Sequence, residues 1–229
     1  KWVLKNKGEK VRARLVVREI KKAKSEYEKL EPSDVFSAMP PVESLKALVS
    51  HVMTERVDKR GRILVLAVFD VSRAHFYGVC ERDVYVEPPA ELHRPGLVAK
   101  LNKTMYGTQD ASNAWQKLWG EHLRNNGFEL GASNPALYRS ELVNGFCHGD
   151  DFVTAAAEDQ IEVFGKMLQE KFDTRRIGLT GAAKHLDKEL EVLHRSVRVI
   201  NDELMEIEAD QKHVPRLSED LGLVQGNVV

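Results

Sequence analysis

The most constraining feature of this sequence is a run of consecutive apolar residues, 63–69, that is followed at once by Asp70. The run has the length of a β-strand and is far shorter than the roughly 20 residues needed to cross a bilayer. Because neither face of the run is polar, we predict a strand that other layers cover on both sides. The chain has 229 residues, 42% of them hydrophobic, and is therefore long enough to build those layers as one medium-sized domain.

A second feature is the Asp150-Asp151 pair, which lies between two further apolar segments, 142–148 and 152–156. This arrangement predicts a β-hairpin with carboxylates at its turn. An ionised carboxylate beside a buried strand is costly unless it is solvated, paired or bound to a metal. If the strands are neighbours, Asp70 and Asp150 can hold two Mg²⁺ ions roughly 4 Å apart, as phosphoryl transfer requires. A solvated turn is the alternative for the Asp-Asp pair considered alone.

The other segments mix helical and strand-like patterns without a strict alternation. We predict strands at 11–18, 84–86, 136–139 and 190–200, and helices at 42–52, 110–127 and 158–172, with a last helix starting at Asp210. Asp110 is expected to cap the second of these helices. No repeat or Ser/Pro-rich linker interrupts the chain. These features indicate a single α+β unit with an antiparallel sheet.

The net charge of -1 hides an asymmetry along the chain. Residues 1–30 contain eight Lys and three Arg against four Glu, a net +7, so the remainder carries -8. Alternation along the predicted strand 11–18 would place Arg12, Arg14 and Arg18 on one face, where they could bind phosphates. A basic segment joined to an acidic remainder fits a protein that binds polyanion on one side and metal cations on the other. A solvated basic face is the alternative.

Other features concern the setting of the protein. We expect no membrane partner, because no apolar segment is long enough to be a span or a signal core. Cys80 and Cys147 are too few for a disulfide framework or a four-cysteine zinc site, which indicates a reducing intracellular setting and a packing role for both. The chain starts at Lys1 without a Met and is expected to be a piece of a longer protein.

Several short blocks occur in a fixed order along the chain. They are Lys1-Trp2-Val3 with 11–16 (Val-Arg-Ala-Arg-Leu-Val), Asp34-Val35-Phe36-Ser37, Asp70-Val71 with 83–89 (Asp-Val-Tyr-Val-Glu-Pro-Pro), Lys100-Leu101, Tyr106-Gly107 with Ala114-Trp115, and Gly149-Asp150-Asp151. In order and wording these blocks resemble the reverse transcriptase domain of copia-type LTR retrotransposon polyproteins. The resemblance covers nearly the whole chain.

The resemblance implies a right-hand polymerase that acts as an RNA-directed DNA polymerase. Its expected parts are fingers at 1–60, a palm at 61–200 with a fingers insertion around 88–107, and the start of a thumb or connection at 201–229, the thumb being largely absent. The implied partners are an RNA template, a DNA primer and dNTP, and the implied location is the cytoplasm, a virus-like particle or the nucleus. The oligomeric state is left open.

The resemblance also implies roles for individual residues. Asp70, Asp150 and Asp151 are the expected catalytic and metal-binding residues, with Asp151 supporting two Mg²⁺ ions held by the other two; Mn²⁺ is a possible substitute. The expected nucleotide-binding residues are Arg12, Arg14, His75 and Gln109. Surface arginines of an edge strand are the alternative for Arg12 and Arg14.

Several positions depart from the family pattern. His75 stands where the family has an aromatic residue that excludes a ribose 2′-hydroxyl, Asp110 stands at the family's Gln, and His148-Gly149 replaces Tyr-Val before the aspartates. A negative charge at position 110 is expected to oppose triphosphate binding. The substitutions at His75, Asp110 and Asn113 support an alternative function: a decayed retrotransposon relic that keeps the polymerase fold as a non-catalytic nucleic-acid-binding or inert domain. The carboxylates alone would also suit another metal-dependent phosphotransferase or a nuclease.

Overall fold

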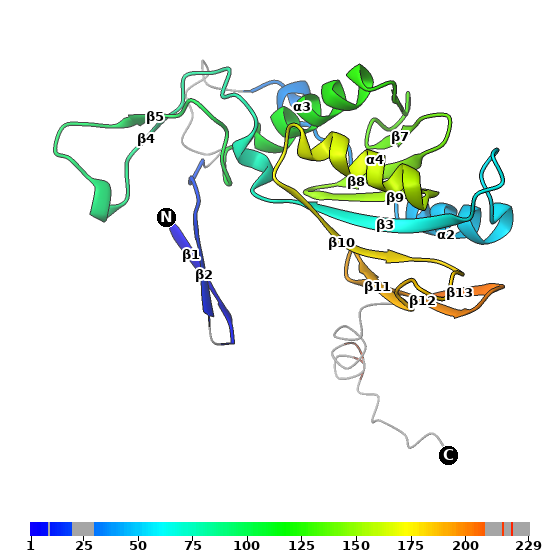
Figure 1. Ribbon diagram of the computed structural model, residues 1–229. Helices are drawn as coiled ribbons and strands as arrows, with labels where there is room; N and C mark the ends of the chain where they lie inside the picture. Colours follow the sequence, from blue (N-terminus) through cyan, green and yellow to red (C-terminus); the bar gives the residue numbers. More distant parts are fainter. Residues whose placement is uncertain (9, 20–29, 209–216, 218–220, 222–229) are drawn as a thin grey trace.

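The computed structural model describes residues 1–8, 10–19, 30–208, 217 and 221, and its central element is an antiparallel sheet (Figure 1). The strands of this sheet follow the spatial order β10-β3-β9-β8-β7-β6. They are β3 (Leu64–Val71), β6 (Glu129–Leu130), β7 (Leu137–Arg139), β8 (Asn144–His148), β9 (Asp151–Ala157) and β10 (Thr174–Thr180). With the helices described below, this confirms the predicted α+β class with an antiparallel sheet.

Strand β3 is the apolar run of the sequence, and it lies between β10 and β9. Its alternate residues point to two different cores. Val65, Ala67 and Phe69 pack into one buried cluster, whereas Leu64, Leu66 and Val68 pack into another. The prediction of a strand covered on both faces is therefore confirmed.

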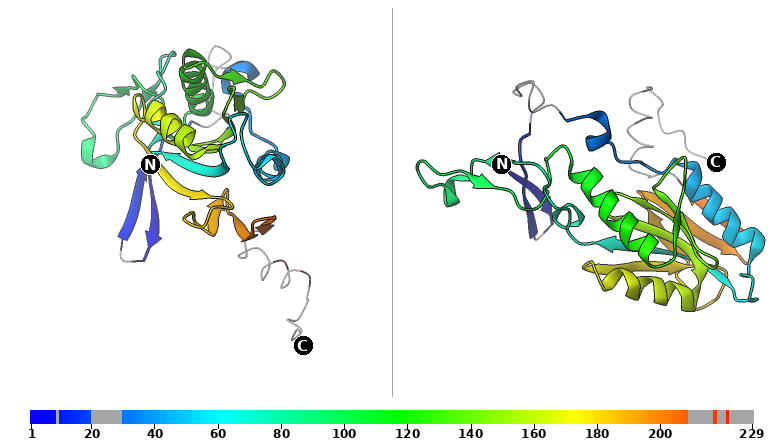
Figure 2. Two further views of the ribbon diagram at one scale, coloured as in Figure 1. Left: turned by 45° about the vertical axis from the view of Figure 1, so that its right-hand side comes forward. Right: turned by 90° about the horizontal axis from the view of Figure 1, so that it is seen from above.

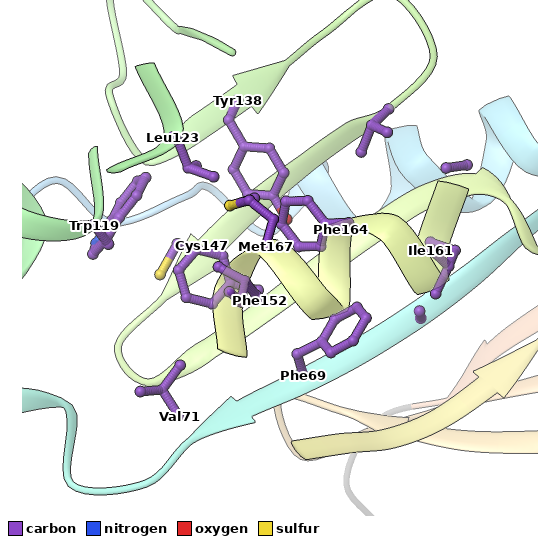
Figure 3. Close-up of a cluster of buried hydrophobic side chains, with 14 of the residues drawn as sticks. Phe69, Val71, Trp119, Leu123, Tyr138, Cys147, Phe152, Ile161, Phe164 and Met167 are labelled. Atoms are coloured by element: carbon purple, nitrogen blue, oxygen red, sulfur yellow. The ribbon is translucent and has the colours of Figure 1, made fainter. Parts of the chain in front are cut away.

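Helices α3 (Ala111–Asn125) and α4 (Glu158–Gln169) cover the first face of the sheet (Figure 2). Both helices place large apolar side chains on that face, as Figure 3 shows for Trp119, Phe164 and Phe152 of the facing strand β9. The rings meet edge to face, with centroids 5.6 Å apart for Trp119 and Phe152 and 6.2 Å apart for Phe152 and Phe164. This geometry is the favourable one for aromatic pairs.

The second face is covered by helix α2 (Glu43–Glu55) and by a separate antiparallel sheet. That sheet consists of β11 (Glu189–Val192), β12 (Arg195–Asn201) and β13 (Leu204–Glu208). The apolar stripe of α2 is buried as predicted, except that Val42 precedes the helix and is 50% exposed. Cys147 is buried in the first core, as its packing role requires, and Cys80 is half-buried.

Two ribbons project from the sheet in Figure 1. One is the hairpin of β1 (Trp2–Lys7) and β2 (Lys10–Leu15), which we call the arginine hairpin because it carries Arg12 and Arg14. The other contains β4 (Tyr85–Val86) and β5 (Ala99–Lys100). The short elements α1 (Pro32–Val35), η3 (Ala74–Phe76) and η4 (Ala90–Leu92) complete the assignment.

Some predicted boundaries were wrong. The strand expected at 11–18 ends at Leu15, so Arg18 does not share its face with Arg12 and Arg14. The strand expected at 190–200 is two strands, because Leu193 and His194 adopt positive φ values of 51° and 62° and reverse the chain. Helix α4 stops at Gln169, three residues before the predicted end. The helix expected from Asp210 starts outside the described residues.

No helix in the described part of the chain is long and apolar enough to span a bilayer.

Candidate active site

Asp70 and Asp151 lie directly opposite each other on neighbouring strands. The antiparallel register of β3 and β9 runs from Leu64 paired with Ala157 to Asp70 paired with Asp151. Directly opposed residues have Cβ atoms about 4.5–5.5 Å apart, and like charges at that spacing repel. Both side chains are partly exposed: Asp70 follows the buried residues of β3, and Asp151 precedes the buried residues of β9. The two carboxylates therefore form an acidic pair at one edge of the sheet.

Asp150 lies in the tight turn between β8 and β9, as predicted, whereas Asp151 is already the first residue of β9. The turn includes Gly149, whose φ of 64° suits glycine. Two hydrogen bonds hold it in place. The indole Nε1 of Trp115 donates to the Gly149 carbonyl at 2.7 Å, and the Val71 amide donates to the Asp150 carbonyl at 2.9 Å. Helix α3 and strand β3 together thus fix the backbone that carries the second and third aspartates.

The electrostatics of this acidic cluster oppose full ionisation. Burial raises the pKa of Asp151 to about 6, and the charges of Asp150 and Asp70 add to that rise, while His194 partly offsets it. Desolvation and the neighbouring negative charges both disfavour the ionised form of Asp151. A bound cation would offset both effects and favour the ionised carboxylate. Mutual repulsion is thus a property of the cluster in the absence of metal.

An arginine lies on the other side of Asp70. Strand β10 pairs Arg175 with Asp70 in register, and its Nε donates to Asp70 Oδ2 at 3.2 Å. The strand order therefore places Arg175, Asp70 and Asp151 in one row. Sequence reasoning did not find Arg175, since strand β10 was not predicted and nothing local marks it as the partner of Asp70.

The three aspartates offer the type of ligand atom that binds divalent metal ions. Carboxylate oxygens are the ligands that Mg²⁺ prefers, and it is usually bound by one or two carboxylates together with substrate phosphates. Asp70 and Asp151 supply such a pair, with Asp150 beside them. Among the described residues, however, no group of three or more His, Cys, Asp or Glu side chains is arranged to hold a metal ion by itself.

Three of the predicted nucleotide-binding residues lie around a single tyrosine near the acidic cluster. The guanidinium of Arg14 lies 5.1 Å from the centroid of the Tyr106 ring, and the His75 ring lies 4.8 Å from it. Burial raises the pKa of Tyr106, Asp150 raises it further, and Arg14 and Arg12 lower it. Because these charges act on one hydroxyl, Arg12, Arg14 and Asp150 share its surroundings. Tyr106 was missed as a site residue; its place in the Tyr-Gly block was the available signal.

His75 is an uncharged neighbour in this group. Burial lowers its pKa, and Asp150 and Arg14 act on it in opposite directions. Its Nδ1 is buried and has no hydrogen-bond partner within the described residues. That nitrogen is shielded from solvent, so in this conformation a nucleotide would have to meet another part of the ring.

Gln109, the fourth predicted nucleotide-binding residue, makes a different contact. Its backbone amide donates to Glu19 Oε2 at 2.7 Å, and its side-chain Nε2 is buried without a partner in the described part of the chain. The structure therefore brings Arg14, His75 and the acidic cluster together. Gln109 instead contacts Glu19, in the segment that follows the arginine hairpin.

Asp110 does not act as the predicted cap. It occupies the N-cap position of α3, but its side chain makes no capping hydrogen bond. Its carboxylate is instead paired with Arg82, whose Nε donates to Asp110 Oδ2 at 2.7 Å. Because Arg82 also pairs with Glu19, the two carboxylates share one guanidinium, and the negative charge that was expected to oppose triphosphate binding is only partly compensated.

Comparisons with known proteins assign the chain to a family. A family profile described as "Reverse transcriptase (RNA-dependent DNA polymerase)" matches residues 1–204. A curated relative, the "Retrovirus-related Pol polyprotein from transposon TNT 1-94" of Nicotiana tabacum, is 26% identical over 147 residues, which are 60% of this chain. The chain spans 10% of the length of that relative.

Two solved structures are similar at a coarse level, and both are of telomerase. The apo telomerase of Candida tropicalis, truncated from its C-terminal domain, has a TM-score of 0.42 at 8% identity, covering 74% of this chain and 40% of that one. The telomerase of Candida albicans with a fragment of telomeric RNA has a TM-score of 0.41 at 10% identity, covering 85% and 36%. The profile match and the tobacco relative confirm the resemblance noted in the sequence: the chain belongs to the reverse transcriptase (RNA-dependent DNA polymerase) family.

Proposed function

We propose that this chain is the polymerase module of a retrotransposon polyprotein and catalyses RNA-directed DNA synthesis. The observation that carries the proposal is the register of β3 and β9, which pairs Asp70 with Asp151 and sets Asp150 beside them. Basic and aromatic groups lie next to these carboxylates, as a site for a triphosphate requires. The family match supports the same reaction.

In this proposal Asp70, Asp150 and Asp151 hold two Mg²⁺ ions, or Mn²⁺ in their place. The ions would lower the pKa of the primer 3′-hydroxyl and neutralise charge on the triphosphate and the departing pyrophosphate. Arg12 and Arg14 of the arginine hairpin bind the triphosphate. His75 and Gln109 belong to the wall of the nucleotide site. Arg175 keeps the Asp70 carboxylate oriented from the opposite strand.

The same proposal assigns the parts of the chain. Residues 1–60 are fingers, 61–200 are palm with a fingers insertion around 88–107, and 201–229 begin the thumb or connection. The arginine hairpin and the β4–β5 projection support this division, because both stand away from the sheet that carries the aspartates (Figure 1). The partners are an RNA template, a DNA primer and dNTP, and the place of action is intracellular.

The direct test is Mg²⁺-dependent incorporation of dNTP on a primed RNA template. The variants are Asp70→Asn and Asp150→Asn, and Asp202→Asn in an exposed turn is the matched control. We expect incorporation by the wild type and the control and none by the site variants. Undiminished incorporation by Asp70→Asn would refute the proposal.

The alternative, a decayed relic, predicts a different pattern. The wild type would fold and bind nucleic acid in a salt-dependent manner that removal of metal does not change, yet it would incorporate nothing. The replacement of the family aromatic by His75 favours this alternative. The charge of Asp110 gives this alternative less support, because Arg82, which Glu19 also contacts, pairs with it.

A further inference from the structure

Contacts within the described residues join the arginine hairpin and the residues just after it to the loop that carries Tyr106. The Val17 amide, just after β2, donates to the Tyr106 carbonyl at 2.8 Å. Arg14 lies over the Tyr106 ring. Both contacts reach the segment that leads into α3, and they link the arginine hairpin to that segment.

The backbones of the two segments meet without intervening side chains. Gly107 has a φ of 94°, and a Cβ added there would lie well inside van der Waals contact with the Val17 carbonyl. A side chain at this position would therefore be strained and would also push the two segments apart. The close approach requires glycine, which explains this part of the Tyr-Gly block.

A partly buried ion-pair network continues the same contact. Arg82 donates through both terminal nitrogens to Glu19, at 2.6 and 2.7 Å, and through Nε and one terminal nitrogen to Asp110, at 2.7 and 3.0 Å. We call these three residues the Arg82 network. Their side chains are only 24% (Arg82), 9% (Glu19) and 14% (Asp110) exposed. Two bidentate pairs share one guanidinium, and the rigid fork of Arg suits this arrangement where Lys would not.

The three members of the network come from separate parts of the chain. Glu19 follows the arginine hairpin, Arg82 precedes β4, and Asp110 starts α3, the helix whose Trp115 also fixes the turn before Asp150. A chain of direct contacts therefore runs from the hairpin, through Glu19, Arg82 and Asp110, to the helix that supports the acidic cluster.

We propose that Arg82 is a positioning residue that clamps the segment after the arginine hairpin to the start of α3 and so sets Arg12 and Arg14 relative to the aspartates. The inference rests on the proposed function for the role of the two arginines, but the clamp itself is a property of the fold. Without Arg82, the Glu19 and Asp110 carboxylates would lose the guanidinium that they share, and the repulsion between the two negative charges would loosen the contact.

Residue-resolved amide hydrogen exchange tests the clamp in the full chain, free of metal. The Val17 amide is the reporter, since its acceptor is the Tyr106 carbonyl, and amides of β3 and β9 report on the sheet. We expect Arg82→Met to speed exchange at Val17 on the order of tenfold while the sheet amides stay unchanged. Arg139→Met is the matched control, because Arg139 pairs with Glu129 on the exposed face of β6–β7 and is 71% exposed.

A milder variant keeps the test decisive if Arg82→Met loosens the whole fold. Glu19→Gln leaves the pair of Arg82 with Asp110 intact and removes only the charge on the hairpin side, so it should also speed Val17 exchange, by a smaller factor. The double variant should be no faster than Arg82→Met alone, since both changes break one network. Unchanged Val17 exchange in Glu19→Gln and in any folded Arg82→Met would overturn the proposal.

Binding of inorganic tripolyphosphate tests the link to Arg12 and Arg14. In metal-free buffer of low ionic strength, the dissociation constant should rise several-fold in Arg82→Met and remain unchanged in Arg139→Met. Equal affinity of the wild type and Arg82→Met would refute the positioning role. Because neither measurement uses polymerisation, a failure here is distinct from a failure of the proposed reaction, which the Asp70→Asn assay reports.

Discussion

Replacing Asp151 by asparagine is expected to stabilise the metal-free protein above pH 6. In the folded chain the pKa of Asp151 is raised to about 6 from 3.8, by burial and by Asp150 and Asp70. A carboxyl whose pKa is raised on folding disfavours the folded state wherever it is ionised. Asparagine keeps the shape of the side chain and removes the charge, so it removes this penalty.

The size of the effect follows from the shift. A rise of about 2 units corresponds to about 3 kcal/mol at roughly 1.4 kcal/mol per unit. Asp151 is partly solvent-exposed, and solvent screening reduces that figure by roughly half, to about 1.5 kcal/mol. The penalty is absent well below pH 3.8, grows as the pH rises from there to about 6, and is complete above that.

Urea unfolding in EDTA at a series of pH values between 4 and 8 measures this gain. The free energy of unfolding of Asp151→Asn should exceed that of the wild type by about 1.5 kcal/mol at pH 8, and the difference should shrink toward pH 4. Asp202→Asn, in an exposed turn, should follow the wild type throughout. A loss of stability in Asp151→Asn at pH 8, or a gain that does not vary with pH, would refute the electrostatic reasoning.

Three further outcomes are expected. Trp115→Phe should lower the free energy of unfolding by about 1 kcal/mol in urea, because the Gly149 carbonyl loses the indole donor while the ring packing largely remains; a value above that of the wild type would contradict this role. Phe152→Ala should cost about 3–5 kcal/mol, since Phe152 is fully buried and its ring contacts Trp119 and Phe164 (Figure 3) as well as Trp115; a loss below 1 kcal/mol in calorimetry or urea would show that the core is not packed as described. Asp58, whose pKa the Arg62 hydrogen bond lowers to about 2, should add stability that is present above about pH 4 and lost as the pH falls toward 2, so acid titration of Asp58→Asn should be flatter than that of the wild type over this window.

The fold class and the aspartates were predictable because their signals are local. The apolar run before Asp70, the buried stripe of α2 and the hairpin around Asp150 each depend on the spacing of side chains within a few residues. Periodicity reports which face of one element is buried, and it does so whatever that element packs against. The wrong boundary at Leu193 has the complementary cause: the reversal there depends on positive φ values in non-glycine residues, which leave little trace in composition.

The partners of the site residues were not predictable, since they lie far apart in the chain. Arg175 is 105 residues from Asp70, and Arg82 is 63 residues from Glu19 and 28 from Asp110. No local pattern relates such residues. For the same reason Asp110 was assigned as a helix cap, a local role, although its carboxylate is held by a residue from another part of the chain.

The sequence by itself determined the apolar strand that ends near Asp70, the acidic turn at Asp150, and the resemblance that leads to the reverse transcriptase family. The tertiary structure alone decided that Asp151 is the residue opposite Asp70, that Arg175 closes the row, and that Arg82 pairs with both Glu19 and Asp110. The physical reason is that burial and periodicity act along a few residues, whereas charge pairing and strand register depend on where distant segments meet once the chain has folded.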